Sequence, residues 1–119
     1  MRFRFGDFTF DGGRRRLLKG SDPVRLSSRA VELLALLLAS RRNAVSKEEI
    51  QDALWPDSLV TETTVATLVS EVRVALGDPA RSPRLVRTVF GFGYVFDGEV
   101  EELPLPEGEG PPRRHVLEW

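Results

Sequence analysis

The sequence predicts an α+β domain in which an antiparallel sheet is followed by three helices and a closing β-hairpin. Changes of hydrophobic period indicate this order. Residues 2–26 form short β-rich runs, residues 27–76 repeat their apolar side chains at helical spacing, and residues 85–96 return to two β runs. We place the folded domain at residues 1–98 and interpret residues 99–119 as an acidic linker or tail rich in proline and glycine.

Composition and charge fit one globular domain with a mildly basic body. The chain has 119 residues, of which 41% are hydrophobic and 29% charged. Residues 1–98 carry 15 Lys or Arg against 12 Asp or Glu, whereas residues 99–119 carry 2 against 6. This asymmetry weakly favours a polyanionic partner for the folded part.

The sequence lacks cysteine, a membrane-spanning run and a signal peptide, and each absence limits where the protein can act. It has no cysteine, which excludes disulfides and thiolate zinc sites and fits a reducing cytoplasm. The longest apolar run, residues 30–39, is too short to span a bilayer, and the first residues lack the apolar core of a signal peptide. We therefore expect a cytoplasmic protein that has no membrane contact.

The N-terminal runs predict a small sheet of three or four strands. Two phenylalanine pairs change parity at Gly6 and Asp7, where we expect a bulge or bend. Turn signals at residues 12–13 and 20–23 separate the later strands. The phenylalanine pairs are Phe3 with Phe5 and Phe8 with Phe10.

The first two helices follow from their apolar stripes and their caps. A helix over residues 27–42 can start at Ser27 or Ser28, and Asn43 is expected to turn left-handed at its end. The second helix starts at Ser46, which forms a capping box with Glu49, and stops before a Trp-Pro pair at residues 55–56.

The third helix is amphipathic and has a slim polar face. It starts at Thr61 or Glu62 and ends at Gly77, with its apolar stripe spread over about 100° of the helical wheel. The opposite face is short, uncharged at its centre and rich in hydroxyl groups. It holds Thr63, Thr67, Ser70 and Val74, flanked by Ala66, Glu71 and Arg73.

The final β runs, residues 85–89 and 94–96, are joined by a loop containing Gly91 and Gly93. A Gly-x-Gly can cradle phosphate, but no helix follows this one, so we interpret it as a hairpin turn. Three helices followed by a hairpin form a winged helix-turn-helix. In that arrangement helix 62–76 enters the DNA major groove, and the wing, residues 85–96, lies on the backbone or in the minor groove.

Two stretches, LWPDSLVTETTVATLVSEVRVALGD and PRLVRTVFGFGYVF, resemble the OmpR/PhoB-type winged-helix output domain of bacterial transcriptional regulators. The resemblance covers roughly residues 3–98. It implies promoter binding to double-stranded DNA, often by tandem or dimeric protomers. It also implies that the loop after the second helix can contact RNA polymerase, which here points to Asp57, Ser58 and Leu59.

Candidate DNA contacts fall on the third helix and around the wing. Glu71 and Phe90 depart from the family pattern, which commonly places arginine at both positions. Trp55 is interpreted first as core packing and second as a phosphate donor. The helix candidates are Thr63, Thr64, Thr67, Ser70, Glu71, Arg73 and Val74, and the wing and backbone candidates are Trp55, Arg84, Arg87, Thr88, Phe90 and Phe92.

Two rival functions remain open at this level. If the domain binds DNA, the side chains of Arg29, Arg73, Arg84 and Arg87 should converge beside the third helix. If it is instead a protein-interaction module, Phe90 and Phe92 should be exposed together with Glu71 and without basic neighbours.

Further expectations concern catalysis and the tail. We expect no enzyme activity, metal or cofactor, because the only histidine, His115, has no partner at a fixed spacing. The acidic tail could fold over the basic face as autoinhibition. Residues 116–119 could add an edge strand, or could begin a further domain of a longer regulator.

Overall fold

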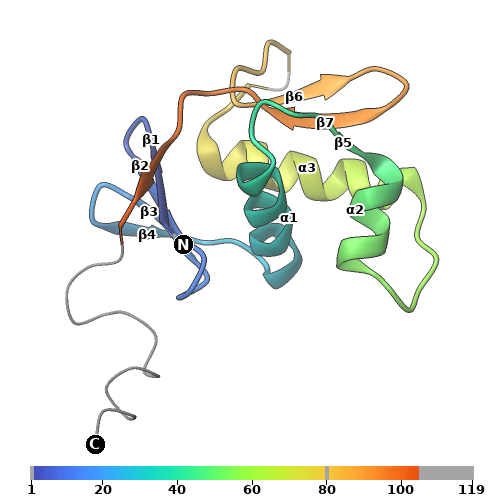
Figure 1. Cartoon of the computed structure of the whole chain (residues 1–119), viewed down its shortest axis with the longest axis horizontal. Helices are drawn as coiled ribbons and strands as arrows, with labels where there is room; N and C mark the ends of the chain where they lie inside the picture. Colours follow the sequence, from blue (N-terminus) through green and yellow to red (C-terminus); the bar gives the residue numbers. More distant parts are fainter. Residues whose placement is uncertain (1, 80, 105–119) are drawn as a thin grey trace, which may run out of the picture.

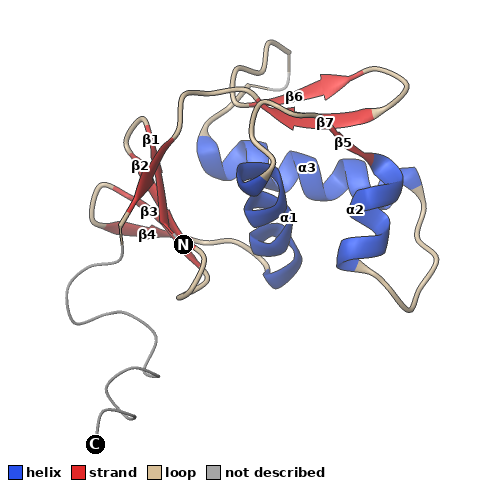
Figure 2. Ribbon diagram, viewed as in Figure 1, coloured by secondary structure: helices blue, strands red, loops and turns tan. Residues whose placement is uncertain are grey.

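The computed structural model describes residues 2–79 and 81–104, and it confirms the α+β winged helix-turn-helix architecture. Figure 1 shows α1 between the N-terminal sheet on one side and α3 with the β6–β7 hairpin on the other. Figure 2 shows the same arrangement as a sheet, a helical layer and a hairpin. The elements are β1 Arg2–Phe5, β2 Phe8–Asp11, β3 Arg16–Lys19, β4 Asp22–Val24, α1 Ser28–Ala39, β5 Val45–Ser46, α2 Lys47–Leu54, α3 Glu62–Leu76, β6 Val86–Val89, β7 Gly93–Phe96 and β8 Glu101–Leu103.

The change of parity at Gly6 and Asp7 is a two-residue hairpin turn, so the expected bulge or bend is wrong. Phe5 pairs with Phe8 across the turn, and Gly6 has a φ of 57°. Paired residues of an antiparallel hairpin point to the same face, and all four phenylalanines of β1 and β2 are therefore buried. The parity change is the consequence of a reversal of the chain.

Strand β8 lies inside the segment expected to be a linker or tail. It pairs antiparallel with β1 and gives the N-terminal sheet the order β4-β3-β2-β1-β8. The Glu102 carboxylate lies 3.5 Å from Arg41 at the end of α1. Glutamates are depleted in strands, so the local sequence gives no strand signal, and pairing to the open edge of β1 decides the conformation.

The remainder of the tail, including His115 and the candidate strand at residues 116–119, lies outside the described residues. The autoinhibition hypothesis therefore stays a prediction. The described part of the tail runs along the edge of the N-terminal sheet.

Helix caps largely follow the sequence. Ser27 caps α1, Ser46 and Glu49 form the capping box of α2, and Thr61 caps α3. After α1 the left-handed residue is Arg42, with a φ of 70°, and the expectation for Asn43 is wrong. The backbone N–H of Arg42 donates to the carbonyl of Phe96 in β7 at 3.0 Å, so a tertiary hydrogen bond fixes this turn.

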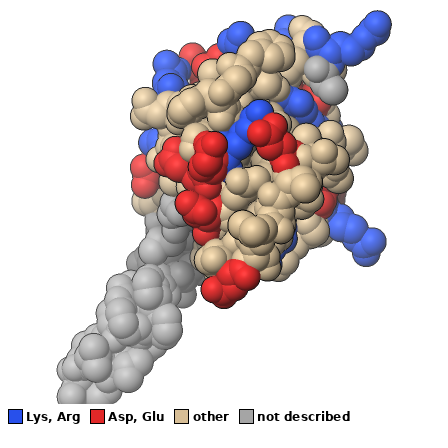
Figure 3. All heavy atoms as spheres, turned by 90° about the vertical axis from the view of Figure 1, so that its right-hand side faces the viewer, with Lys and Arg blue, Asp and Glu red and all other residues tan. Residues whose placement is uncertain are grey.

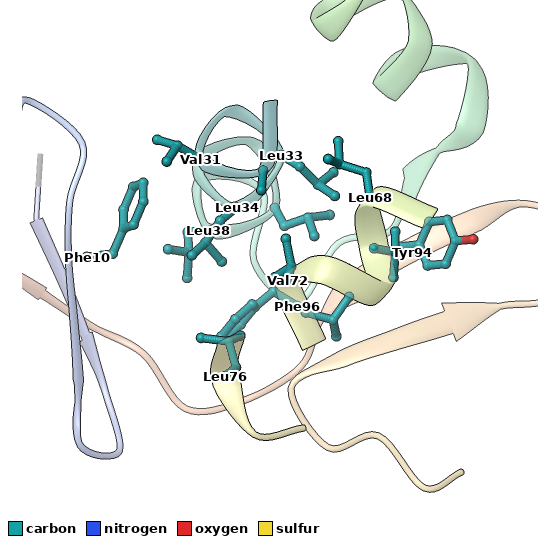
Figure 4. Close-up of a cluster of buried hydrophobic side chains, with 14 of the residues drawn as sticks. Phe10, Val31, Leu33, Leu34, Leu38, Leu68, Val72, Leu76, Tyr94 and Phe96 are labelled. Carbon is teal, nitrogen blue, oxygen red and sulfur yellow. The ribbon is translucent and has the colours of Figure 1, made fainter. Parts of the chain in front are cut away.

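One hydrophobic core joins both sheets to the helices. Figure 4 shows Leu34 and Leu38 of α1 between Phe10 of the N-terminal sheet and Val72 of α3. All four side chains are fully buried. The core fixes the rotation of α3, because its apolar stripe must face α1 and β7. The opposite side of α3 is left to solvent.

Candidate nucleic-acid interface

The outward strip of α3 is the candidate interface, and its exposure agrees with the sequence. Val65, Leu68, Val69, Val72 and Leu76 are buried. We define the reading face as the exposed residues Thr63, Ala66, Thr67, Ser70 and Val74. Val74 is 80% exposed. The Thr67 hydroxyl donates to the carbonyl of Thr63 at 2.9 Å, which leaves its oxygen able to accept from a ligand.

One edge of the reading face is tied to α1 through Glu71. The carboxylate of Glu71 accepts from the backbone N–H of Ser27 at 2.7 Å and from its hydroxyl at 2.9 Å. The Ser27 hydroxyl oxygen in turn accepts from the Ala30 N–H at the start of α1. The sequence suggested Glu71 as a DNA contact, but both of its carboxylate oxygens accept hydrogen bonds within the fold.

The other edge is tied to the wing through Arg73. Its Nε donates to the carbonyl of Val86 at 2.9 Å, and its terminal nitrogen donates to the Thr88 hydroxyl at 3.0 Å. The guanidinium of Arg73 thus joins α3 to β6, and the Thr88 hydroxyl is one of the two groups on β6 that accept from it. Since Arg73 and Glu71 lie on opposite flanks of the helix, the reading face is braced from both sides.

The expected convergence of four arginines beside α3 does not include Arg87, which lies across β6 from Arg73. The Arg73 guanidinium binds the side of β6 that faces α3. Arg87 projects from the opposite side of that strand, because neighbouring residues of a strand alternate, and it lies 2.7 Å from the Asp97 carboxylate. Arg29 stacks 5.6 Å from the ring of Trp55, which is half-buried at the end of α2. Of the rival pattern, the joint exposure of Phe90 and Phe92 is confirmed, whereas Glu71 is half-buried and bonded to Ser27.

The wing tip is a short aromatic loop. Phe90 is 92% and Phe92 is 44% exposed. Gly91 has a φ of 75°, and the N–H of Phe92 donates to the Val89 carbonyl, so a tight turn forms at the tip. The sequence prediction of a hairpin turn is confirmed.

Strand β5, which sequence analysis missed, holds the base of this loop. Val45 pairs with Tyr94 and Ser46 with Gly93. A Cβ atom on Gly93 would lie 2.0 Å from the Val45 carbonyl oxygen, so only glycine allows this approach. Two residues give too short a run to be recognised as a strand, and β5 is defined only by its partner.

Two polar interactions near the interface were not predicted from the sequence. The buried Asp78 carboxylate accepts from the N–H groups of Arg84, Leu85 and Val86, at 2.7, 3.2 and 2.9 Å. It therefore organises the connection between α3 and β6. The Lys47 ammonium lies 3.1 Å from the Glu62 carboxylate and links the starts of α2 and α3. The Gly-Asp-Pro sequence after the helix was the available signal for Asp78.

The loop between α2 and α3 presents Asp57, Ser58 and Leu59 to solvent, and Leu59 is fully exposed. Its base is fixed by Gln51, which donates to the Val60 carbonyl at 3.0 Å. Figure 3 views the side of the molecule that bears this loop and the wing tip. Uncharged side chains cover much of that face, acidic groups gather on it, and several Lys or Arg side chains extend at its margins.

Over residues 2–79 and 81–104, no helix is long and apolar enough to cross a membrane. The same ranges gather no group of three His, Cys, Asp or Glu side chains that could hold a metal ion.

Comparison with known proteins identifies the family. The family model for "Transcriptional regulatory protein, C terminal" matches residues 21–96. Over 93 residues the chain is 37% identical to the transcriptional regulatory protein TrcR of Mycobacterium tuberculosis, covering 77% of this chain and 35% of that protein. It is 34% identical to the regulatory protein VirG of Agrobacterium fabrum, covering 83% of this chain and 40% of that protein. The chain thus spans well under half the length of these relatives.

Solved structures agree with the fold. The response regulator DrrB of Thermotoga maritima, described as an OmpR/PhoB homolog, superposes with a TM-score of 0.75 at 26% identity, covering 82% of this chain and 44% of that one. The RstA DNA-binding domain of Klebsiella pneumoniae, solved with the RstA box, gives a TM-score of 0.72 at 23% identity, covering 81% and 96%. The chain therefore belongs to the transcriptional regulatory protein C-terminal family, the OmpR/PhoB-type winged helix-turn-helix domains.

Proposed function

We propose that this chain binds double-stranded DNA sequence-specifically as part of a transcriptional regulator. The reading face is the observation that carries the proposal. It is exposed, narrow and uncharged, and it is held at a fixed orientation by the core behind it and by Glu71 and Arg73 at its flanks. A helix with such a face fits the major groove, where hydroxyl and methyl groups can read base edges.

The reading face divides into two kinds of contact. The hydroxyls of Thr63, Thr67 and Ser70 donate to or accept from base edges or phosphates, and Val74 packs on a thymine methyl group. Thr64, at the flank of the first helical turn, contacts the backbone. Around the wing, Arg84 supplies a phosphate contact, whereas Arg87 is paired with Asp97.

The internal use of cations limits the electrostatic part of binding. Arg73 is committed to β6 and Arg87 to Asp97, so few guanidinium groups remain for phosphate. Each lost phosphate contact lowers the slope of affinity against salt by about 0.9 on a double-logarithmic scale. We therefore expect the affinity to depend on salt only shallowly.

The α2–α3 loop is the proposed contact for RNA polymerase. Its three exposed residues, Asp57, Ser58 and Leu59, lie beyond the end of α2. DNA binding by tandem or dimeric protomers belongs to the same proposal.

Selection from random duplexes at two salt concentrations tests the function. We expect one enriched motif, and Thr67→Val and Ser70→Ala each to weaken its binding by about 0.5–1.5 kcal/mol, the net contribution of one hydrogen bond. Thr9→Val, on β2 of the N-terminal sheet, is the matched control and should bind like the wild type. Absence of any enriched motif would refute the proposal.

A second candidate is supported by one observation, the exposure of Phe90. An aromatic ring at the centre of an exposed loop can anchor a protein partner. If this were the function, the chain would enrich no motif, and Thr67→Val would change nothing. The random-duplex selection therefore distinguishes the two functions.

A further inference from the structure

The wing tip differs chemically from a wing that contacts DNA phosphates through Lys or Arg. Residues 88–96 contain no Lys or Arg, so the tip offers no positive charge to a phosphate. Its most exposed large apolar side chain is the phenyl ring of Phe90, which is 92% exposed. Whatever the tip recognises must therefore accept an uncharged planar ring.

The tip is held rigidly from one side. The carbonyl of Phe92 accepts from the backbone N–H of Lys47, at the start of α2, at 3.0 Å. Gly93 packs against the backbone of β5, and the turn closes through the bond from Phe92 N–H to the Val89 carbonyl. Phe92 is thus anchored to the body, whereas Phe90 precedes the turn glycine and projects into solvent.

The tip is also placed relative to the reading face. Arg73 ties β6 to the flank of α3, and Figure 1 shows the hairpin running alongside that helix with its loop projecting outward. With the helix in a major groove, a hairpin at its flank reaches the neighbouring sugar–phosphate backbone and minor groove.

We propose that Phe90 is an apolar wedge that enters the minor groove and partly unstacks one base step, an inference that rests on the proposed DNA binding. A phenyl ring cannot neutralise phosphate, but it can insert at a step and stack on the opened base. Pyrimidine–purine steps open most easily. Phe90 therefore selects TA or CA/TG steps at the wing position through their deformability, without hydrogen bonds to base edges.

The test uses the full chain and the duplex enriched by selection, with 2-aminopurine replacing adenine at steps in the wing half of the site. Binding is followed by fluorescence anisotropy, and unstacking by the rise in 2-aminopurine emission. Phe90→Ala should weaken binding between about 5-fold and 150-fold, the equivalent of one lost stacking contact. It should abolish the emission rise and the step preference while leaving the salt slope unchanged.

Two further variants sharpen the result. Phe90→Arg should steepen the salt slope by about one, through a new phosphate contact, without restoring the emission. Thr9→Val, on β2 of the N-terminal sheet, is again the control and should behave as the wild type. Unchanged thermal unfolding of each variant shows that the fold is retained.

The outcomes separate the wedge from the function on which it rests. If the wild-type chain enriches no duplex, both proposals fail. If DNA binding depends on Thr67 but Phe90→Ala leaves affinity and emission unchanged, the wedge is rejected and the proposed function stands. If that substitution alters only the self-association of the chain in sedimentation, Phe90 is a protein contact, and the wedge is again rejected.

Discussion

The substitution Gly93→Ala should destabilise the domain through a backbone collision that no side-chain movement can relieve. The new Cβ would lie 2.0 Å from the Val45 carbonyl oxygen and 2.8 Å from the Ser46 Cα, whereas ordinary contacts begin at 3.4 Å. Strands β5 and β7 must therefore separate by more than 1 Å. Overpacking costs about 1–3 kcal/mol, and weakened β5–β7 hydrogen bonds add about 1 kcal/mol. We expect a total of about 2–4 kcal/mol.

Urea unfolding followed by circular dichroism measures this loss, with a fall in melting temperature of about 8–16 °C as a second readout. Gly91→Ala is the matched control in the same loop. Gly91 has a φ of 75° but open space around its Cβ position, so alanine there meets only the left-handed strain of about 1–2 kcal/mol. If Gly93→Ala were as stable as the wild type, or no less stable than Gly91→Ala, the close approach of β5 to β7 would be disproved.

Three further changes test other joints of the fold. Asp78→Ala should cost about 2–4 kcal/mol in urea unfolding, because three backbone N–H groups lose their acceptor. Asp78→Asn should cost less, and equal losses would contradict this role. Glu71→Gln should cost about 1 kcal/mol in the same assay, since the amide nitrogen that replaces one carboxylate oxygen cannot accept from Ser27. A neutral result would show that the contact adds no stability. A chain ending at Gly98 should be about 1–2 kcal/mol less stable than one ending at Pro104, because β1 loses its pairing with β8. The exposed edge of β1 should also make the shorter chain self-associate in sedimentation. Identical behaviour of the two chains would mean that β8 does not protect that edge.

The two family departures on the interface have different structural outcomes. Glu71 replaces a phosphate contact with a tie to Ser27, so the reading face keeps its rigidity and loses a cation. Phe90 replaces a cation with an exposed ring on a braced turn. In the proposed DNA complex, both changes shift recognition from charge towards shape and apolar contact.

Local patterns were sufficient for the elements whose signals lie within a few residues. The buried stripe of α3, the Ser46 capping box and Gly77 at the helix end are set by helical periodicity and by backbone groups that need nearby partners. The same patterns predicted the reading face, since a helix with one apolar side exposes the other. The motifs of the second helix, third helix and wing were enough to indicate the family.

Long-range pairing decided the rest. Strands β5 and β8 are too short or too acidic to be recognised, and they exist because β7 and β1 offer open edges. Arg73 carries a charge suited to DNA, and Glu71 was a candidate contact on the same helix, yet each is engaged by a partner at least 13 positions away, Val86 or Ser27. The sequence specifies which side chains carry a charge. The folded chain decides which partner lies at hydrogen-bond distance from each charge.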